Sequence, residues 1–228
     1  MKKKYLLSVL ILSCFVLIAA CGTLGQQKEK FTVSLNSPQV PIGEFETQFS
    51  TFMSLAGLKK DSVKVLYFPR EDAVCLQYRR DFTTYHQFWS YPGRQSFITA
   101  LEQYNADYEE RNLDTKNRRT IRNYSVVEGY LYWQMASFTV QAKANVNVEI
   151  GYQFRDNSPY FSIHQREAEY KEEMTRDHNR TSTAITMYFT RAQAAELAAL
   201  FDQSFLQTML SPRREAIGEE IEADKDTY

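Results

Sequence analysis

The stretch FTVQAKANVNVEIGYQF, residues 138–154, decides the fold of this chain. Its odd positions are polar or glycine, and its even positions are all apolar: Phe138, Val140, Ala142, Ala144, Val146, Val148, Ile150, Tyr152 and Phe154. Successive side chains of a β-strand point to opposite faces, so this alternation predicts a strand with one buried face. A three-residue loop at Lys143-Ala144-Asn145 would also preserve the alternation. We expect one long strand rather than two.

A turn follows this ribbon at Asp156-Asn157-Ser158-Pro159 and leads into a partner strand. With Asn157-Ser158 at the tip of the turn, Phe154 would face Phe161 and Tyr152 would face Ile163. Apolar side chains would then lie opposite apolar side chains.

Similar patterns predict the remaining elements. Strands are expected at residues 31–35, 63–68, 73–80, 124–135 and 184–189, and residues 81–90 also favour a strand. Helices are expected at 44–55, 94–111 and 191–210, the last starting from a capping box formed by Thr190 and Gln193. The predicted fold class is α+β: a single domain whose largely antiparallel β-sheet is packed on one face by two amphipathic helices, at about 94–111 and 191–210.

The chain length and its 43% hydrophobic content are sufficient for one domain with a substantial core. We expect a signal peptide at 1–20, a lipidated cysteine and tether at 21–30, the α+β domain at 31–211 and an acidic flexible tail at 212–228.

The first segment has the features of an export signal. Three lysines, Lys2 to Lys4, precede an apolar run that ends in small residues. Ile18-Ala19-Ala20-Cys21 then resembles the lipobox of bacterial lipoproteins. The resemblance implies cleavage before Cys21, a diacylglycerol on its sulfur and usually a further acyl chain such as palmitate. It also implies an exported protein anchored to the cell membrane or outer membrane. An ordinary cleaved signal and an uncleaved anchor are the alternatives.

The charge balance limits the classes of partner. Removal of the three signal lysines from 27 basic residues leaves 24 against 28 acidic ones, a net charge of −4. Such a chain has neither the basic surplus of a general nucleic-acid binder nor a general attraction to anionic lipid. The acyl chains must therefore supply the membrane affinity.

No motif for catalysis, a metal or a cofactor is present in the sequence. The histidines His86, His164 and His178 are far apart, and no glycine-rich phosphate loop occurs. Carboxylates cluster at residues 167–173, where a solvated strand edge is favoured over a pair of catalytic acids. Cys75, the one cysteine left after processing and lipidation, is expected to be a buried thiol.

Two groups of residues are candidates for ligand contact. A basic cluster could contact an anionic ligand: Lys116, Arg118, Arg119 and Arg122. An aromatic group could stack on a sugar or accept an acyl chain: Tyr85, Phe88, Trp89 and Tyr91. The alternatives are a solvated loop for the first group and core packing for the second.

The sequence therefore favours a membrane-anchored envelope lipoprotein that acts as a non-catalytic binding or assembly module. Its partners would be the membrane, through the lipid anchor, and an envelope protein or glycan. An envelope hydrolase and a carrier of an apolar ligand are the two alternatives. A hydrolase requires a pocket with converging acids or histidines, and a carrier requires an apolar cavity.

Overall fold

The computed structural model describes residues 30–51, 58–114, 122–135, 141–155, 157–170 and 181–210. The chain divides into two units, Met1–Lys30 and Phe31–Tyr228. The second unit contains, in chain order, β1 (Val40–Thr51), β2 (Lys59–Phe68), β3 (Ala73–Arg80), β4 (Thr83–Trp89), α2 (Tyr91–Glu109), β5 (Arg122–Met135), β6 (Ala142–Arg155), β7 (Ser158–Gln165), β8 (Ile185–Phe189) and α3 (Arg191–Phe201). Residues 203–210 are also helical.

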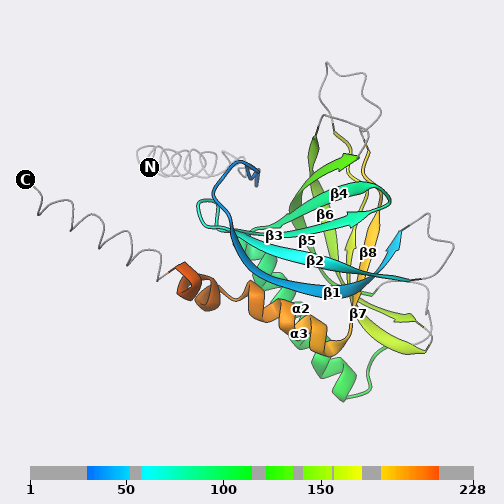
Figure 1. The fold of residues 1–228 in the computed structure, drawn as a ribbon. Helices are drawn as coiled ribbons and strands as arrows, with labels where there is room; N and C mark the ends of the chain where they lie inside the picture. The colour runs from blue at the N-terminus through cyan, green and yellow to red at the C-terminus, as the bar shows by residue number, and fades with distance from the viewer. Residues whose placement is uncertain are drawn as a thin grey trace, which may run out of the picture. The chain divides into compact units, whose positions relative to one another are not determined.

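The eight strands form a closed antiparallel barrel (Figure 1). Each strand pairs with the next one along the chain, and β1 pairs with β8 through Gln48 opposite Tyr188 and Phe49 opposite Met187. The prediction of a largely antiparallel sheet with helices is confirmed. The structure is more specific than this prediction, because β1 pairs with β8 and closes the sheet into a barrel.

Residues 142–154 of the ribbon belong to β6, one of the two longest strands of the barrel, and residues 138–140 lie outside the described residues. Its even positions from Ala142 to Tyr152 face the main core, as predicted, and the strand continues through residues 143–145 without a turn. The predicted register is wrong by two residues, since Tyr152 lies opposite Phe161 and Phe154 opposite Pro159. The turn is therefore centred one residue earlier than predicted. The shift is an even number of residues, so the same side chains stay on the inner face and apolar residues still lie opposite each other.

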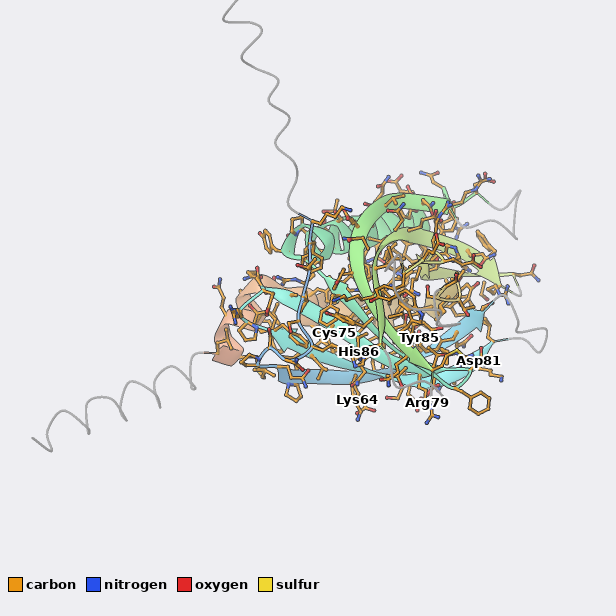
Figure 2. All side chains as sticks on the ribbon, turned by 90° about the horizontal axis from the view of Figure 1, so that it is seen from above. Lys64, Cys75, Arg79, Asp81, Tyr85 and His86 are labelled. Atoms are coloured by element: carbon orange, nitrogen blue, oxygen red, sulfur yellow. The ribbon has the colours of Figure 1, made fainter. Side chains whose placement is uncertain are left out.

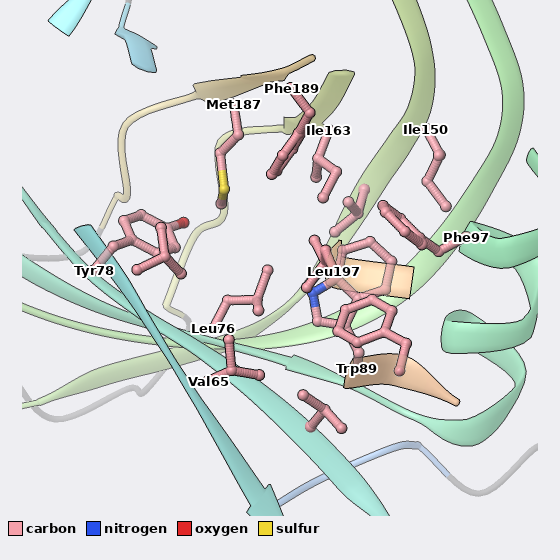
Figure 3. Close-up of a cluster of buried hydrophobic side chains, with 14 of the residues drawn as sticks. Val65, Leu76, Tyr78, Trp89, Phe97, Ile150, Ile163, Met187, Phe189 and Leu197 are labelled. Carbon is pink, nitrogen blue, oxygen red and sulfur yellow. The ribbon is translucent and has the colours of Figure 1, made fainter. Parts of the chain in front are cut away.

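The two helices pack beside each other at one end of the barrel (Figure 1). Helix α2 connects the end of β4 to the start of β5, and α3 follows the end of β8, so both belong to the same end. Their buried faces join the barrel interior: Phe97 lies 5.4 Å from Phe161, and Phe201 lies 5.3 Å from Trp89, between ring centroids. Figure 3 shows this cluster, in which Phe97 and Leu197 meet strand residues such as Ile163.

Three predicted elements differ from the structure. Residues 31–35 form no strand, and residues 44–51 of the predicted helix belong to β1. Phe45 and Phe49 are four residues apart, a spacing that places them on one face of a strand as well as of a helix. The last predicted helix is interrupted at Asp202, which has extended backbone angles. The tail at 212–228 lies outside the described residues.

Candidate functional site

The segment before β1 crosses the outer surface of the barrel, and we call residues 31–38 the strap. Val33 is the buried residue of the strap. It belongs to a second apolar cluster, which lies outside the barrel interior. Strand residues complete this cluster: Leu66, Phe68, Ala73, Cys75, Phe88 and Tyr130. Cys75 therefore lies in an apolar layer under the strap, and burial raises the pKa of its thiol well above the usual value.

A groove of about 690 Å³ runs beside the strap, and we call it the strap groove. It is formed by the strap, the β2–β3 turn and the outer faces of β5 and β6. Its walls consist of Thr32, Val33, Ser34, Asn36, Ser37, Pro38, Arg70, Glu71, Tyr130, Tyr132 and Lys143. Its volume is that of a site for a small ligand.

Two tyrosines from β5 form the aromatic wall of this groove. The rings of Tyr130 and Tyr132 meet edge to face, 5.3 Å apart and at 88°. The Tyr132 hydroxyl donates a hydrogen bond of 2.7 Å to the Val33 carbonyl, which holds the strap on the barrel. Burial, and then the neighbouring Tyr130, raise the pKa of Tyr132 to about 12. This hydroxyl therefore remains a donor at neutral pH.

Charged side chains of both signs complete the groove. Arg70 and Lys143 are exposed, and within the described part of the chain no ion pair includes either of them. Glu71 accepts a hydrogen bond from Ser37 through Oε1, whereas its Oε2 is buried with no hydrogen-bond partner in the described part of the chain. The groove thus offers donors from the two cations, and the covered Oε2 of Glu71 becomes an acceptor for a ligand only if neighbouring side chains move.

The predicted basic cluster is only partly described. Lys116, Arg118 and Arg119 lie outside the described residues. Arg122 is the first residue of β5, and its Nη2 forms an ion pair of 2.7 Å with Asp114. Arg122 is therefore already neutralised by a carboxylate of the α2–β5 connection.

The four predicted aromatic residues do not share one surface. Tyr85 and Trp89 point into the barrel and are buried, and Phe88 is buried in the outer cluster beneath the strap. Tyr91 is the exposed member, and the Arg94 guanidinium lies 5.5 Å from its ring centroid. Phe88 does reach the strap groove indirectly, because its ring contacts that of Tyr132 at 5.9 Å.

The two described histidines occupy separate places. His86 bonds to Gln77 at 2.9 Å and His164 to Thr186 at 2.8 Å. Among the residues that the structure describes, no group of three or more His, Cys, Asp and Glu side chains could hold a metal ion. No helix within the described ranges is both long enough and apolar enough to cross a membrane.

Sequence reasoning missed the strap groove. Its residues come from four separate segments of the chain, and the strap was predicted to be a strand. The one local signal for this groove was the pair Tyr130 and Tyr132, which lie on one face of a predicted strand.

The fold and the site together define an antiparallel β-barrel protein with a groove on its outer surface, beside the strap. A family model described as "Uncharacterised Treponema protein" matches residues 23–208, and the chain belongs to this family. No curated protein matches the chain. No solved structure matches it either.

Proposed function

We propose that this protein is a lipid-anchored bacterial envelope lipoprotein that binds an envelope glycan in the strap groove without catalysing a reaction. The observation that carries the proposal is the composition of the groove. It combines tyrosine rings, exposed cations and the Glu71 carboxylate, whose buried Oε2 has no partner among the described residues, in about 690 Å³.

A glycan is the ligand class that complements these groups. Each sugar hydroxyl both donates and accepts, so it can accept a hydrogen bond from Arg70 or Lys143 and can donate to Glu71 Oε2 once the side chains that cover this atom move. The tyrosines present apolar ring surface and polar hydroxyl groups together, which suits a ligand with apolar faces and polar edges. A fully apolar ligand would provide no partner for the Glu71 carboxylate and would remove water from the exposed cations.

The N-terminal sequence supports the membrane location. Ile18-Ala19-Ala20-Cys21 resembles a lipobox, and about nine residues separate Cys21 from the strap. Such a tether spans at most about 30 Å. The strap groove would therefore stay close to the membrane surface, where envelope glycans are within reach.

Binding to cell-wall fragments tests the proposal. The probe is the soluble glycan released by muramidase from the cell wall of the producing bacterium, and titration calorimetry gives the Kd. Glu71→Gln should weaken binding about tenfold or more, since a hydrogen bond to a charged group contributes about 1.5–3 kcal/mol. Lys143→Ala should also weaken it.

Lys64→Ala is the matched control, because Lys64 is an exposed lysine that points away from the barrel on β2, outside the groove (Figure 2). Its Kd should equal that of the wild type. Absence of binding by the wild-type protein, or equal Kd values for wild type and Glu71→Gln, would refute a glycan site in this groove.

A further inference from the structure

Arg80 is a buried arginine inside the barrel. It is the last residue of β3, and it shares the inward face of that strand with Val74, Leu76 and Tyr78. Its side chain is 5% exposed, and its guanidinium lies over the Phe49 ring, 5.1 Å from the centroid. β3 ends at the opposite end of the barrel from helices α2 and α3. Arg80 is therefore a cation at the inner side of the barrel mouth.

The guanidinium is only partly neutralised. Nη1 lies 3.7 Å from the carboxylate of Asp61, which is 42% exposed. The other two nitrogens, Nε and Nη2, are buried and have no hydrogen-bond partner among the residues that the structure describes. These two nitrogens form one edge of the guanidinium fork, the kind of edge that binds a carboxylate through two parallel hydrogen bonds.

Gln165 provides a further unused donor in the same interior. Its Oε1 accepts hydrogen bonds from the Tyr78 hydroxyl at 2.8 Å and from Gln87 Nε2 at 3.3 Å. Gln165 Nε2 is buried and has no partner within the described ranges. Burial raises the pKa of Tyr78 well above its usual value, so its hydroxyl stays protonated and fixes the orientation of this amide.

The interior residues form one connected cluster. The Tyr78 ring stacks on Tyr85 at 5.4 Å and also lies 5.4 Å from the ring of Phe49, over which Arg80 packs. Figure 2 shows Tyr85 within the barrel, whereas Arg79, the neighbour of Arg80, points outward. Every unused polar group of Arg80 and Gln165 is a donor. The complementary ligand therefore carries acceptors and negative charge.

We propose that Arg80 binds the carboxylate of a small organic acid through Nε and Nη2, inside the mouth of the barrel, with Gln165 as an additional donor. The mouth of a β-barrel is a frequent place for a small ligand. Because the two nitrogens have no accessible surface, the acid must displace neighbouring side chains as it enters. This favours a small acid over a long one.

Three acids test the proposal: acetate, hexanoate and benzoate, at constant ionic strength, with the corresponding amides as neutral isosteres. At least one acid should raise the Tm of the purified protein and bind measurably by calorimetry, and its amide should not. Arg80→Met should raise the Kd of that acid at least about tenfold. Arg79→Gln should leave the Kd unchanged, because Arg79 is exposed on the outer face.

Arg80→Lys serves as the second variant. It keeps the charge but lacks the planar fork, so it should also bind the acid more weakly than the wild type. Arg80→Met should still fold, because replacing a poorly paired buried charge with an apolar residue is often neutral. Glu71→Gln should not change acid binding, which separates this site from the strap groove.

Four results would overturn the proposal. They are the absence of binding for all three acids, full affinity in Arg80→Met, full affinity in Arg80→Lys, or inorganic phosphate binding as tightly as the best acid. The last result would indicate a general anion site without selectivity for carboxylates.

Discussion

Gly151 lies in β6 where the chain of β5 passes closely over it. An added Cβ would meet the Arg122 carbonyl oxygen at 1.7 Å and its carbonyl carbon at 2.6 Å. Both atoms belong to backbone, at the bulge where the β5–β6 register shifts between Asn123 and Ser125. No rotation of a side chain can relieve this contact, so β5 would have to move.

Gly151→Ala should therefore lower the free energy of unfolding by about 3 kcal/mol. Gly43→Ala is the matched control, because its added Cβ would meet only the end of the Leu200 side chain, at 2.8 Å. Leu200 can change rotamer, so the cost should stay below about 1 kcal/mol. Urea unfolding followed by tryptophan fluorescence measures both variants. Equal losses in the two would contradict the role of the backbone contact.

Among the elements, β6 could be predicted from sequence and β1 could not. β6 has strict alternation over its whole length, because its odd face is polar at Lys143, Asn145 and Asn147. In β1, a register shift between Pro41 and Gly43 and a phenylalanine spacing of four obscured the alternation. Closure of the barrel depends on β1 pairing with β8, at the other end of the domain's sequence. No local pattern encodes such a pairing.

The candidate sites show the same limit. Among the described residues, the aromatic and basic candidates chosen from the sequence do not line the strap groove, which exists only because the strap folds over β5 and β6. Arg80 appeared as one of two adjacent arginines at the end of a predicted strand. Its inward position follows from the alternation, but its unpaired nitrogens depend on Asp61 and the barrel interior.

Arg94 connects three elements at the helix end of the barrel. It is fully buried on α2, and it donates to the Phe201 carbonyl at 3.1 Å and to Gln203 Oε1 at 2.9 Å. It also donates to the Asp72 carboxylate at 2.7 Å and carbonyl at 3.2 Å, in the β2–β3 turn. One side chain thus ties α2 to the end of α3 and to the strand turn.

Arg94→Met should lower the free energy of unfolding by about 3 kcal/mol, because it leaves the Phe201 carbonyl without this donor and removes the ion pair with Asp72. Arg191→Met is the control: Arg191 pairs with Glu109 at 2.8 Å, but both side chains are well exposed. That loss should be below about 1 kcal/mol. Chemical denaturation distinguishes the two, and a loss for Arg191→Met as large as that for Arg94→Met would contradict this ranking.

For the whole molecule, two histidines predict how stability depends on pH. Burial lowers the pKa of His86 from its ordinary value of 6.5. Burial is also the main cause that lowers the pKa of His164, with Arg166 in the same direction and Glu149 opposing. Below pH 6.5 the unfolded chain binds protons at these positions more readily than the folded barrel. The free energy of unfolding should therefore fall as the pH drops from 6.5 through the folded pKa values.

Denaturant titrations between pH 5 and 8 should show this decline in the wild type and a flatter profile in His86→Gln/His164→Gln. Glutamine can keep a hydrogen bond with Gln77 or Thr186 but cannot bind the extra proton. A double variant with the wild-type slope would assign the pH dependence to other groups.

The proposed anchor and the strap groove should be separable, because they belong to different parts of the chain. Cys21→Ser should abolish incorporation of labelled palmitate in cells, and the protein should move from the detergent phase to the aqueous phase on Triton X-114 partitioning. Cys75→Ala is the control and should keep the label, since Cys75 is buried under the strap and has no exposed sulfur to acylate. The Kd for the cell-wall glycan should be the same in Cys21→Ser and wild type, because the groove begins at Thr32. Palmitate at the wild-type level in Cys21→Ser would refute the anchor, whereas weaker glycan binding in that variant would mean that the lipidated terminus forms part of the binding site.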